Sequence, residues 1–104
     1  MIKKITTEEF NNLNNEYVVL DLYADWCGPC KMIAPWLEEI SEEASLAHVS
    51  FNKVNVDEEE AVAKKFGVQA IPTVIILKNG EEIGRKIGFV PKNGLLDWIS
   101  SNTK

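Results

Sequence analysis

The segment from residue 17 to residue 24, YVVLDLYA, constrains the fold more than any other part of the chain. It is apolar almost throughout instead of alternating between apolar and polar residues, which is typical of a strand covered on both faces in a parallel sheet. One charged residue, Asp21, interrupts the run. Such a strand needs helices on both sides of its sheet, so the segment predicts an α/β fold.

Helical patterns lie on both sides of this strand in the sequence. Thr6 and Glu9 fit a capping box, which predicts a short helix before the strand. After the strand, apolar residues recur at helical spacing while glutamates fill the positions between them, so we expect a long amphipathic helix with Pro35 inside it. Its apolar residues are Ile33, Trp36, Leu37, Ile40 and Ala44.

The second half of the chain continues the alternation of strand and helix. Residues 49–56 alternate like a strand, and Asp57 is expected to cap a helix that stops at Gly67. Residues 73–77 form a short apolar strand that precedes a turn.

Asn79-Gly80 predicts a type I′ hairpin into a strand over residues 81–87. Because a hairpin pairs its strands antiparallel, the expected architecture is a mixed central β-sheet flanked by α-helices on both faces. Pro91 suits the first turn of a last helix. The apolar stripe of that helix is Leu95, Trp98 and Ile99.

Composition places the chain among globular proteins and excludes several partners. Apolar residues make up 45% and charged residues 26% of the 104 residues, which suits a single domain over residues 1–104. A net charge of −5 without a cluster of lysines or arginines makes nucleic acid a poor partner. The N-terminus lacks the apolar stretch of a secretory signal, no run reaches transmembrane length, and two cysteines are too few for a disulfide framework. We therefore expect a cytoplasmic monomer that binds neither nucleic acid nor membrane.

Two cysteines, Cys27 and Cys30, lie between the buried strand and the long helix in the motif WCGPC of residues 26–30. Cysteines three residues apart in a first helical turn lie close enough for a disulfide to bridge them with little backbone movement. Cys27 falls at or just before the helix N-terminus, where unpaired N–H groups and the helix dipole favour a thiolate. Half ionisation of the Cys27 thiol at pH 7 requires about 2 kcal/mol of stabilisation of its thiolate, the upper end of what a helix terminus supplies. A neighbour such as Lys31 is therefore expected to contribute.

Two other interpretations of the cysteine pair stay open. The cysteines could be buried structural thiols. They could also bind zinc, but structural zinc takes four ligands, and His48 is the one further nitrogen or sulfur ligand that the chain offers. A metal would then have to be shared between two chains, so we expect no metal site and no cofactor.

Four stretches of the sequence together resemble the thioredoxin family, namely DLYADWCGPCKMIAP, NVD, GVQAIPT and KNGEEIGRKIG. The resemblance spans nearly the whole chain, and a C-x-x-C pair near a strand-helix-strand pattern is already an established signature of this family. It implies the thioredoxin fold and a dithiol-disulfide oxidoreductase that acts on protein disulfides. It also implies a thioredoxin reductase as the partner that regenerates the dithiol.

The resemblance also assigns roles to the residues of the motif. It makes Cys27 the attacking nucleophile and Cys30 the resolving one, and it implies that Gly28 and Pro29 help to set the redox potential. The absence of histidine between the cysteines resembles the reducing branch of the fold. An oxidase or isomerase, which would differ in reduction potential, and a binding module with incidental cysteines are the rival functions.

By the same resemblance, Asp21 matches a buried aspartate that exchanges a proton with the resolving cysteine, and Lys53 matches the lysine near it. Physical chemistry supports this independently, because a carboxylate in an apolar strand has its charged form disfavoured and should titrate at an unusually high pH. The alternative is an aspartate at a strand end that reaches water.

Trp26, Ile71, Pro72 and Gly88 match the family's groove for an extended substrate segment. Pro72 matches a cis-proline, although by itself it reads as the first residue of a strand. Trp26 alone would fit a core and Gly88 a bulge or strand end. His48 is expected beside the C-terminus of the long helix without a catalytic role, and Trp98 in the core. Three departures from the family's common residues bear on partner preference: Tyr23 in place of tryptophan, Trp36 in place of an aliphatic residue, and Phe89 in place of a small one.

Overall fold

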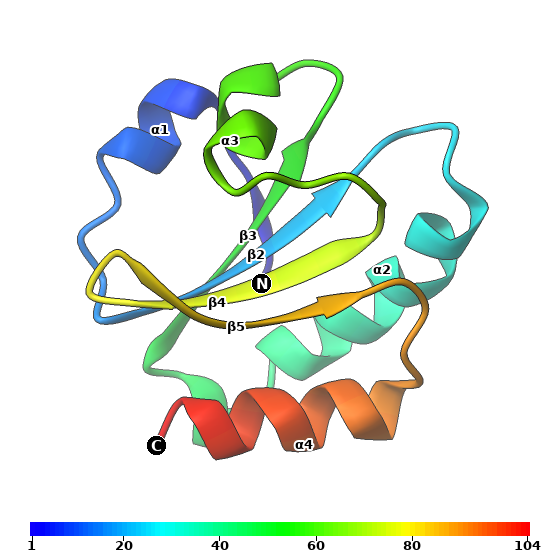
Figure 1. The fold of residues 1–104 in the computed structure, drawn as a ribbon. Coiled ribbons are helices and arrows are strands. Elements are labelled where there is room, and N and C mark those ends of the chain that lie inside the picture. The colour runs from blue at the N-terminus through cyan, green and yellow to red at the C-terminus, as the bar shows by residue number, and fades with distance from the viewer.

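The computed structural model describes residues 1–104 and contains a five-stranded sheet between two layers of helices (Figure 1). The spatial order of the strands is β1-β3-β2-β4-β5. Strand β3 pairs in parallel with β1 and β2, whereas β4 pairs antiparallel with β2 and β5, so the predicted mixed sheet is confirmed. The strands are β1 (Lys3–Lys4), β2 (Tyr17–Tyr23), β3 (Val49–Asn55), β4 (Thr73–Lys78) and β5 (Glu81–Ile87).

Helices cover both faces of the sheet, with α1 and α3 on one face and α2 and α4 on the other (Figure 1). The capping box predicted for the first helix is present, because the Thr6 hydroxyl accepts the N–H of Glu9 at 3.1 Å and the Glu9 carboxylate accepts the N–H of Thr6 at 3.1 Å. The helices are α1 (Thr7–Asn11), α2 (Gly28–Ser41), α3 (Glu60–Lys65) and α4 (Lys92–Asn102), and a short 3-10 turn, η1, spans Ala44–Leu46.

Strand β2 lies at the centre of the sheet and divides its side chains between two cores. Successive side chains of a strand point to opposite faces. Leu20 therefore packs in the core that also contains Val62 of α3, whereas Val19 packs in the core that contains Leu37 of α2. Asp21 lies two residues after Val19, so its side chain points to the same face of the sheet, the face that α2 covers. It is the one charged residue of β2.

The predicted hairpin is confirmed, because Asn79 and Gly80 both have positive φ, at 51° and 85°. A type I′ turn requires positive φ at both central residues, which asparagine and glycine adopt most readily.

The prediction that Asp57 caps the third helix is wrong. Helix α3 begins at Glu60, and no side chain caps it. Instead, the side-chain oxygen of Asn55 accepts the N–H groups of Asp57 at 2.9 Å and Glu58 at 3.3 Å, so the chain makes a turn before the helix starts. The carboxylate of Asp57 is thereby left free for another partner.

Three further expectations need correction at the ends of elements. The long helix stops at Ser41, and Ala44 lies in η1. His48 lies beside a helix C-terminus as expected, but this is the end of α4, where its Nε2 pairs with the backbone carbonyl of Thr103. Trp98 is half-buried and covers Gly84 of β5 instead of lying deep in the core.

Candidate active site

Cys27 and Cys30 form a disulfide at the start of α2. Their Cα atoms lie 5.3 Å apart, within the usual range for disulfides. Pro29 lies in the first helical turn, where its missing N–H costs no helical hydrogen bond. The cysteine motif is therefore the beginning of the helix itself, as its sequence position predicts.

Cys27 is the N-cap of α2, with an extended backbone at φ −88° and ψ 110°. Its Sγ accepts the backbone N–H of Cys30 at 3.2 Å. The N–H groups of a first helical turn have no carbonyl partners within the helix, and they stabilise negative charge placed beside them. When the disulfide is open, this geometry favours a thiolate on Cys27.

Exposure does not distinguish the two cysteines, since Cys27 is 4% exposed and Cys30 is 3% exposed. Their neighbours differ instead. Cys27 caps the helix, whereas Cys30 lines a cavity that reaches Asp21. Lys31, which the sequence suggested as a stabilising neighbour for the thiolate, lines this same cavity.

Asp21 is buried, with 2% of its surface exposed and no hydrogen-bond partner for its Oδ1. In the sheet it lies opposite Lys53 of β3 and Val74 of β4. Burial raises the pKa of Asp21 to about 7, although the positive charge of Lys53 acts in the opposite direction. The alternative of an exposed carboxylate at a strand end is therefore wrong, because Asp21 is buried within β2. A buried carboxyl without a partner and with this pKa is poised to gain and lose a proton near neutral pH.

A cavity of about 120 Å³ joins Asp21 to Cys30. Lys53, Tyr23 and Lys31 also line it. A polar cavity holds a water molecule once it offers about 10–15 Å³, so this one has room for water between the carboxyl and the sulfur. The structure thus brings Asp21, Lys53 and Cys30 to one place.

The peptide bond between Ile71 and Pro72 is cis. The side chain of Ile71 packs against the cluster formed by Ala24 and the two cysteines. The N–H of Gly88 donates to the carbonyl of Pro72 at 2.8 Å, and Gly88 has φ +87°, a conformation that glycine adopts without strain. By contrast, the N–H and C=O of Ile71 take part in none of the backbone hydrogen bonds of the chain. Ile71 therefore offers free backbone groups next to the disulfide.

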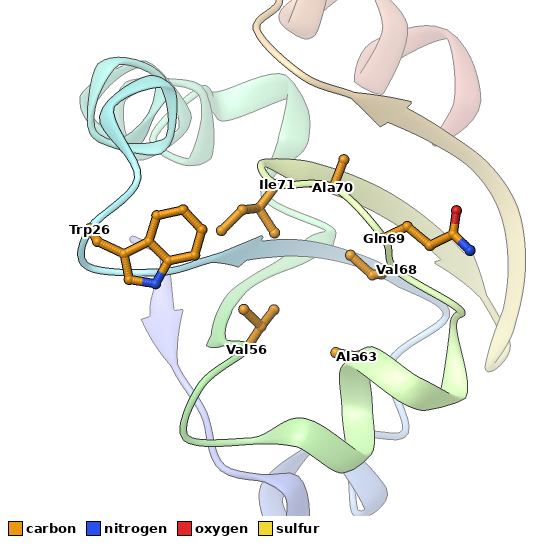
Figure 2. A pocket seen from close by; sticks show the side chains of 7 residues that line it. All are labelled: Trp26, Val56, Ala63, Val68, Gln69, Ala70 and Ile71. Atoms are coloured by element: carbon orange, nitrogen blue, oxygen red, sulfur yellow. The ribbon is translucent and has the colours of Figure 1, made fainter.

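An apolar hollow lies on the other side of Ile71, below the start of α2 (Figure 2). Trp26 borders it with a ring that is 71% exposed, and Figure 2 shows the side chain of Ile71 directed towards that ring. The indole Nε1 of Trp26 donates to Oδ2 of Asp57 at 2.9 Å. The other lining residues are Val56, Ala63, Val68, Gln69 and Ala70.

Sequence reasoning missed Val56 and Asp57 as members of this site. Val56 borders the hollow directly after the end of β3, and Asp57 holds the indole of Trp26. The motif NVD contains both residues and was the signal that could have pointed to them. The interpretation of Trp26 as a core residue is wrong, because most of its ring is exposed.

No group of three or more histidine, cysteine, aspartate or glutamate side chains lies close enough together to hold a metal ion. None of the helices combines the length and the apolar character that crossing a membrane requires.

Comparisons with known proteins agree with this geometry. A family model described as Thioredoxin matches residues 1–101. Thioredoxin of Rickettsia prowazekii is 41% identical over 105 residues, covering 98% of this chain and 99% of that protein. Thioredoxin of Bacillus subtilis is 43% identical over 102 residues, covering 97% of each. Among solved structures, thioredoxin of Malassezia sympodialis superposes with a TM-score of 0.91 at 36% identity, covering 100% of this chain and 92% of that one.

Proposed function

Because this chain belongs to the thioredoxin family and is a thiol-disulfide oxidoreductase, we propose a division of roles among the residues around its two cysteines. The observation that carries the proposal is the asymmetry of the Cys27–Cys30 disulfide. Cys27 caps α2, whereas Cys30 faces the cavity of Asp21. Cys27 is therefore the attacking nucleophile and Cys30 the resolving one.

The reaction begins from the dithiol. The Cys27 thiolate attacks one sulfur of a protein disulfide, the S–S bond of the substrate breaks, and a mixed disulfide forms while the other substrate sulfur leaves as a thiolate that takes a proton from water. Cys30 then loses its proton and attacks the Cys27 sulfur, which releases the second substrate thiol and leaves the Cys27–Cys30 disulfide. Two electrons pass from the dithiol to the substrate.

Asp21 is the group that accepts the proton of Cys30. A pKa of about 7 leaves roughly half of the carboxyl groups ionised at neutral pH, which suits a general base at that pH. The cavity supports transfer through water, since it joins the two side chains. Lys53 lies opposite Asp21 in the sheet and keeps the pKa of the carboxyl from rising further.

The groove around Trp26, Ile71, Pro72 and Gly88 binds an extended segment of the substrate. The free N–H and C=O of Ile71 support this role, because an extended chain laid beside them gains two backbone hydrogen bonds. Trp26 and the hollow below it provide apolar contact for a side chain of that segment.

Gly28 and Pro29 tune the redox potential, because they separate the two cysteines within the first turn. Gly28 lies in open space, with no atom of a non-neighbouring residue within 4 Å of the place where a Cβ would stand. A thioredoxin reductase would return the disulfide to the dithiol. The net charge of −5 and a site made by residues of one chain support a monomer. Both cysteines of the chain belong to this redox pair and none to a structural disulfide, which supports action on proteins in the cytoplasm.

The test is the reduction of insulin by dithiothreitol, followed by turbidity. The wild-type protein is expected to accelerate the reaction, and Cys27→Ser is expected to abolish the acceleration. Asp97→Asn on the exposed side of α4 serves as a matched control that keeps it. A wild-type protein that does not accelerate insulin reduction would instead be a binding module.

A redox titration against glutathione separates the reductant from the oxidase or isomerase of the same fold. About 30 mV corresponds to about 1.4 kcal/mol for this two-electron couple, so a modest difference in potential is measurable. A potential more oxidising than that of glutathione would overturn the assignment as a reductant.

A further inference from the structure

Most of the large apolar side chains exposed to solvent lie next to residues of the site in the sequence. Six such residues are exposed in the chain, and four of them adjoin the site in the sequence. Trp26 precedes Cys27, Met32 follows Cys30 by two residues, and Ile87 and Phe89 flank Gly88. Clustered apolar exposure on a small protein marks a binding surface more often than scattered residues do.

Phe89 contacts Trp36 of α2, and the two rings form an aromatic pair. Trp36 packs on the core between the sheet and α2, whereas Val56, Ala63 and Val68 of the hollow near Trp26 pack on the core of the opposite face. Their ring centroids are 5.5 Å apart with an interplanar angle of 64°, an edge-to-face contact. Trp36 is half-buried, whereas Phe89 is 47% exposed.

The pair adjoins the groove through Phe89 and is extended along α2 by Met32. Met32 lies one helical turn before Trp36 on the same face of α2, and it is 55% exposed. Met32 and Trp36 thus form a short apolar stripe along one face of α2. At the other end, Phe89 follows Gly88, whose N–H is bonded to the carbonyl of Pro72.

The segment that carries Phe89 is held in place from both sides. The hydrogen bond of Gly88 fixes its beginning, and an ion pair between Lys92 of α4 and Glu39 of α2 ties the next element to the helix of Trp36. Between β5 and α4 the chain contacts α2 through the Phe89–Trp36 pair. A surface fixed in this way loses little freedom when a ligand binds.

We infer that Phe89 and Trp36 form an aromatic subsite that receives an apolar side chain of the substrate segment flanking its disulfide, and that they determine substrate preference. The inference rests on the proposed function, since it needs a substrate chain in the groove at Ile71 and Pro72. Its occupant is a phenylalanine, leucine or similar side chain within a few residues of the substrate cysteine. Such a chain is already held by the groove, so the subsite adds preference without a second binding event.

The test compares peptide substrates with and without an aromatic side chain. Disulfide-linked homodimers of a peptide with one cysteine carry phenylalanine or alanine at each of three positions on either side of the cysteine. The readout is the ratio of kcat/KM for the phenylalanine and alanine peptides. At one position or more, the wild-type ratio is expected to be about 5- to 20-fold, the discrimination that a partly buried apolar group supplies.

Variants then assign that preference to the pair. Phe89→Ala is expected to bring the ratio to within about 2-fold of one, and Phe89→Leu to leave an intermediate ratio, because leucine keeps part of the apolar contact. Ile83→Ala, at an exposed apolar position of β5 outside the stripe, is the matched control and keeps the full ratio. A preference supplied by the hollow of Trp26 would not respond to Phe89.

A wild-type ratio near one at every position, or a ratio that Phe89→Ala leaves unchanged, would overturn the subsite. In that case reduction of the alanine peptides would still support the proposed function. If the wild-type protein reduced no peptide at all, the proposed function would fail and the subsite with it.

Discussion

Replacing Asp21 with asparagine is expected to stabilise the protein at pH 8 and to slow disulfide exchange. The substitution keeps the shape of the side chain but removes its charge and its proton. Because Asp21 is 2% exposed and its Oδ1 has no hydrogen-bond partner, burying the charged carboxylate costs free energy of folding. Stability and activity should therefore change in opposite directions.

The size of the effect follows from the pKa of Asp21, which is about 7 in the folded protein against an ordinary 3.8. A folded pKa above the unfolded one means that Asp21 favours folding most below about pH 4, and that this contribution is lost as the pH rises through 7. A difference of that size corresponds to about 4 kcal/mol at 1.36 kcal/mol per pH unit. Burying an amide with an incomplete set of hydrogen bonds costs about 1–3 kcal/mol. The expected net gain at pH 8 is then about 1–3 kcal/mol, with little or no gain at pH 4.

Guanidinium unfolding of the oxidised protein, followed by far-UV circular dichroism at pH 4.5 and pH 8, measures this difference. With a slope of about 4 kcal/mol/M for a chain of this size, a gain of about 2 kcal/mol moves the midpoint by about 0.5 M. Asp97→Asn, at an exposed position of α4, reports the general effect of losing a carboxylate. Insulin reduction at pH 7 should fall about 100-fold in Asp21→Asn, the lower end of what a general base usually contributes.

Two results would refute this reasoning. If the difference in stability between Asp21→Asn and wild type were the same at both pH values, Asp21 would not be the buried group that titrates. If Asp21→Asn lost stability at pH 8 while its specific activity stayed unchanged, the carboxylate would have a structural role.

In the reduced protein at pH 7, iodoacetamide should label Cys27 at least about 10-fold faster than Cys30, because only Cys27 caps α2; mass spectrometry assigns the label, and equal rates would reverse the assignment of roles. Cys30→Ser should accumulate dithiothreitol-sensitive adducts with substrate proteins, since no nearby thiol resolves the mixed disulfide; Cys27→Ser/Cys30→Ser is the control, and equal capture by both variants would contradict the redox mechanism. Asp57→Ala should raise the KM for insulin about 2- to 5-fold with a loss of stability below about 1 kcal/mol, because the exposed indole of Trp26 loses the partner that orients it; an unchanged KM would show that the bond does not matter for binding.

The layers of the fold could be predicted because their signals are local. The continuous apolar run of β2 needs no knowledge of its partners to indicate burial on both faces. The hairpin at Asn79-Gly80 is equally local, since few residue pairs adopt positive φ twice in succession. Thr6 and Glu9 satisfy each other's backbone within four residues.

Features that depend on distant partners could not be predicted in this way. Strand β1 consists of Lys3 and Lys4, both exposed, and it exists only through backbone pairing with β3. Aspartate is a common helix cap, but at Asp57 the side-chain oxygen of Asn55 accepts the backbone N–H and forms the turn. The carboxylate of Asp57 instead accepts a hydrogen bond from Trp26, 31 residues earlier in the chain. Competing partners of this kind leave no periodic signal in the sequence.

The active site also contains features of both kinds, those with local signals and those that depend on distant residues. The position of Cys27 at a helix start and the burial of Asp21 follow from neighbouring residues, and the structure shows both. The cavity that joins Asp21 to Cys30 depends on how α2 crosses the sheet, which the residues around each group do not specify.

The aromatic pair shows why two separate aromatic residues gain meaning only in three dimensions. In the sequence, Trp36 and Phe89 lie 53 positions apart, and only Trp36 belongs to a helix. In the structure they contact each other, so each large ring fills the space that a smaller partner at the other position would leave open. Replacing either residue with alanine would remove this contact. Their joint presence therefore argues for a built surface beside the groove, and the surface in turn predicts that the two residues act as one unit in substrate preference.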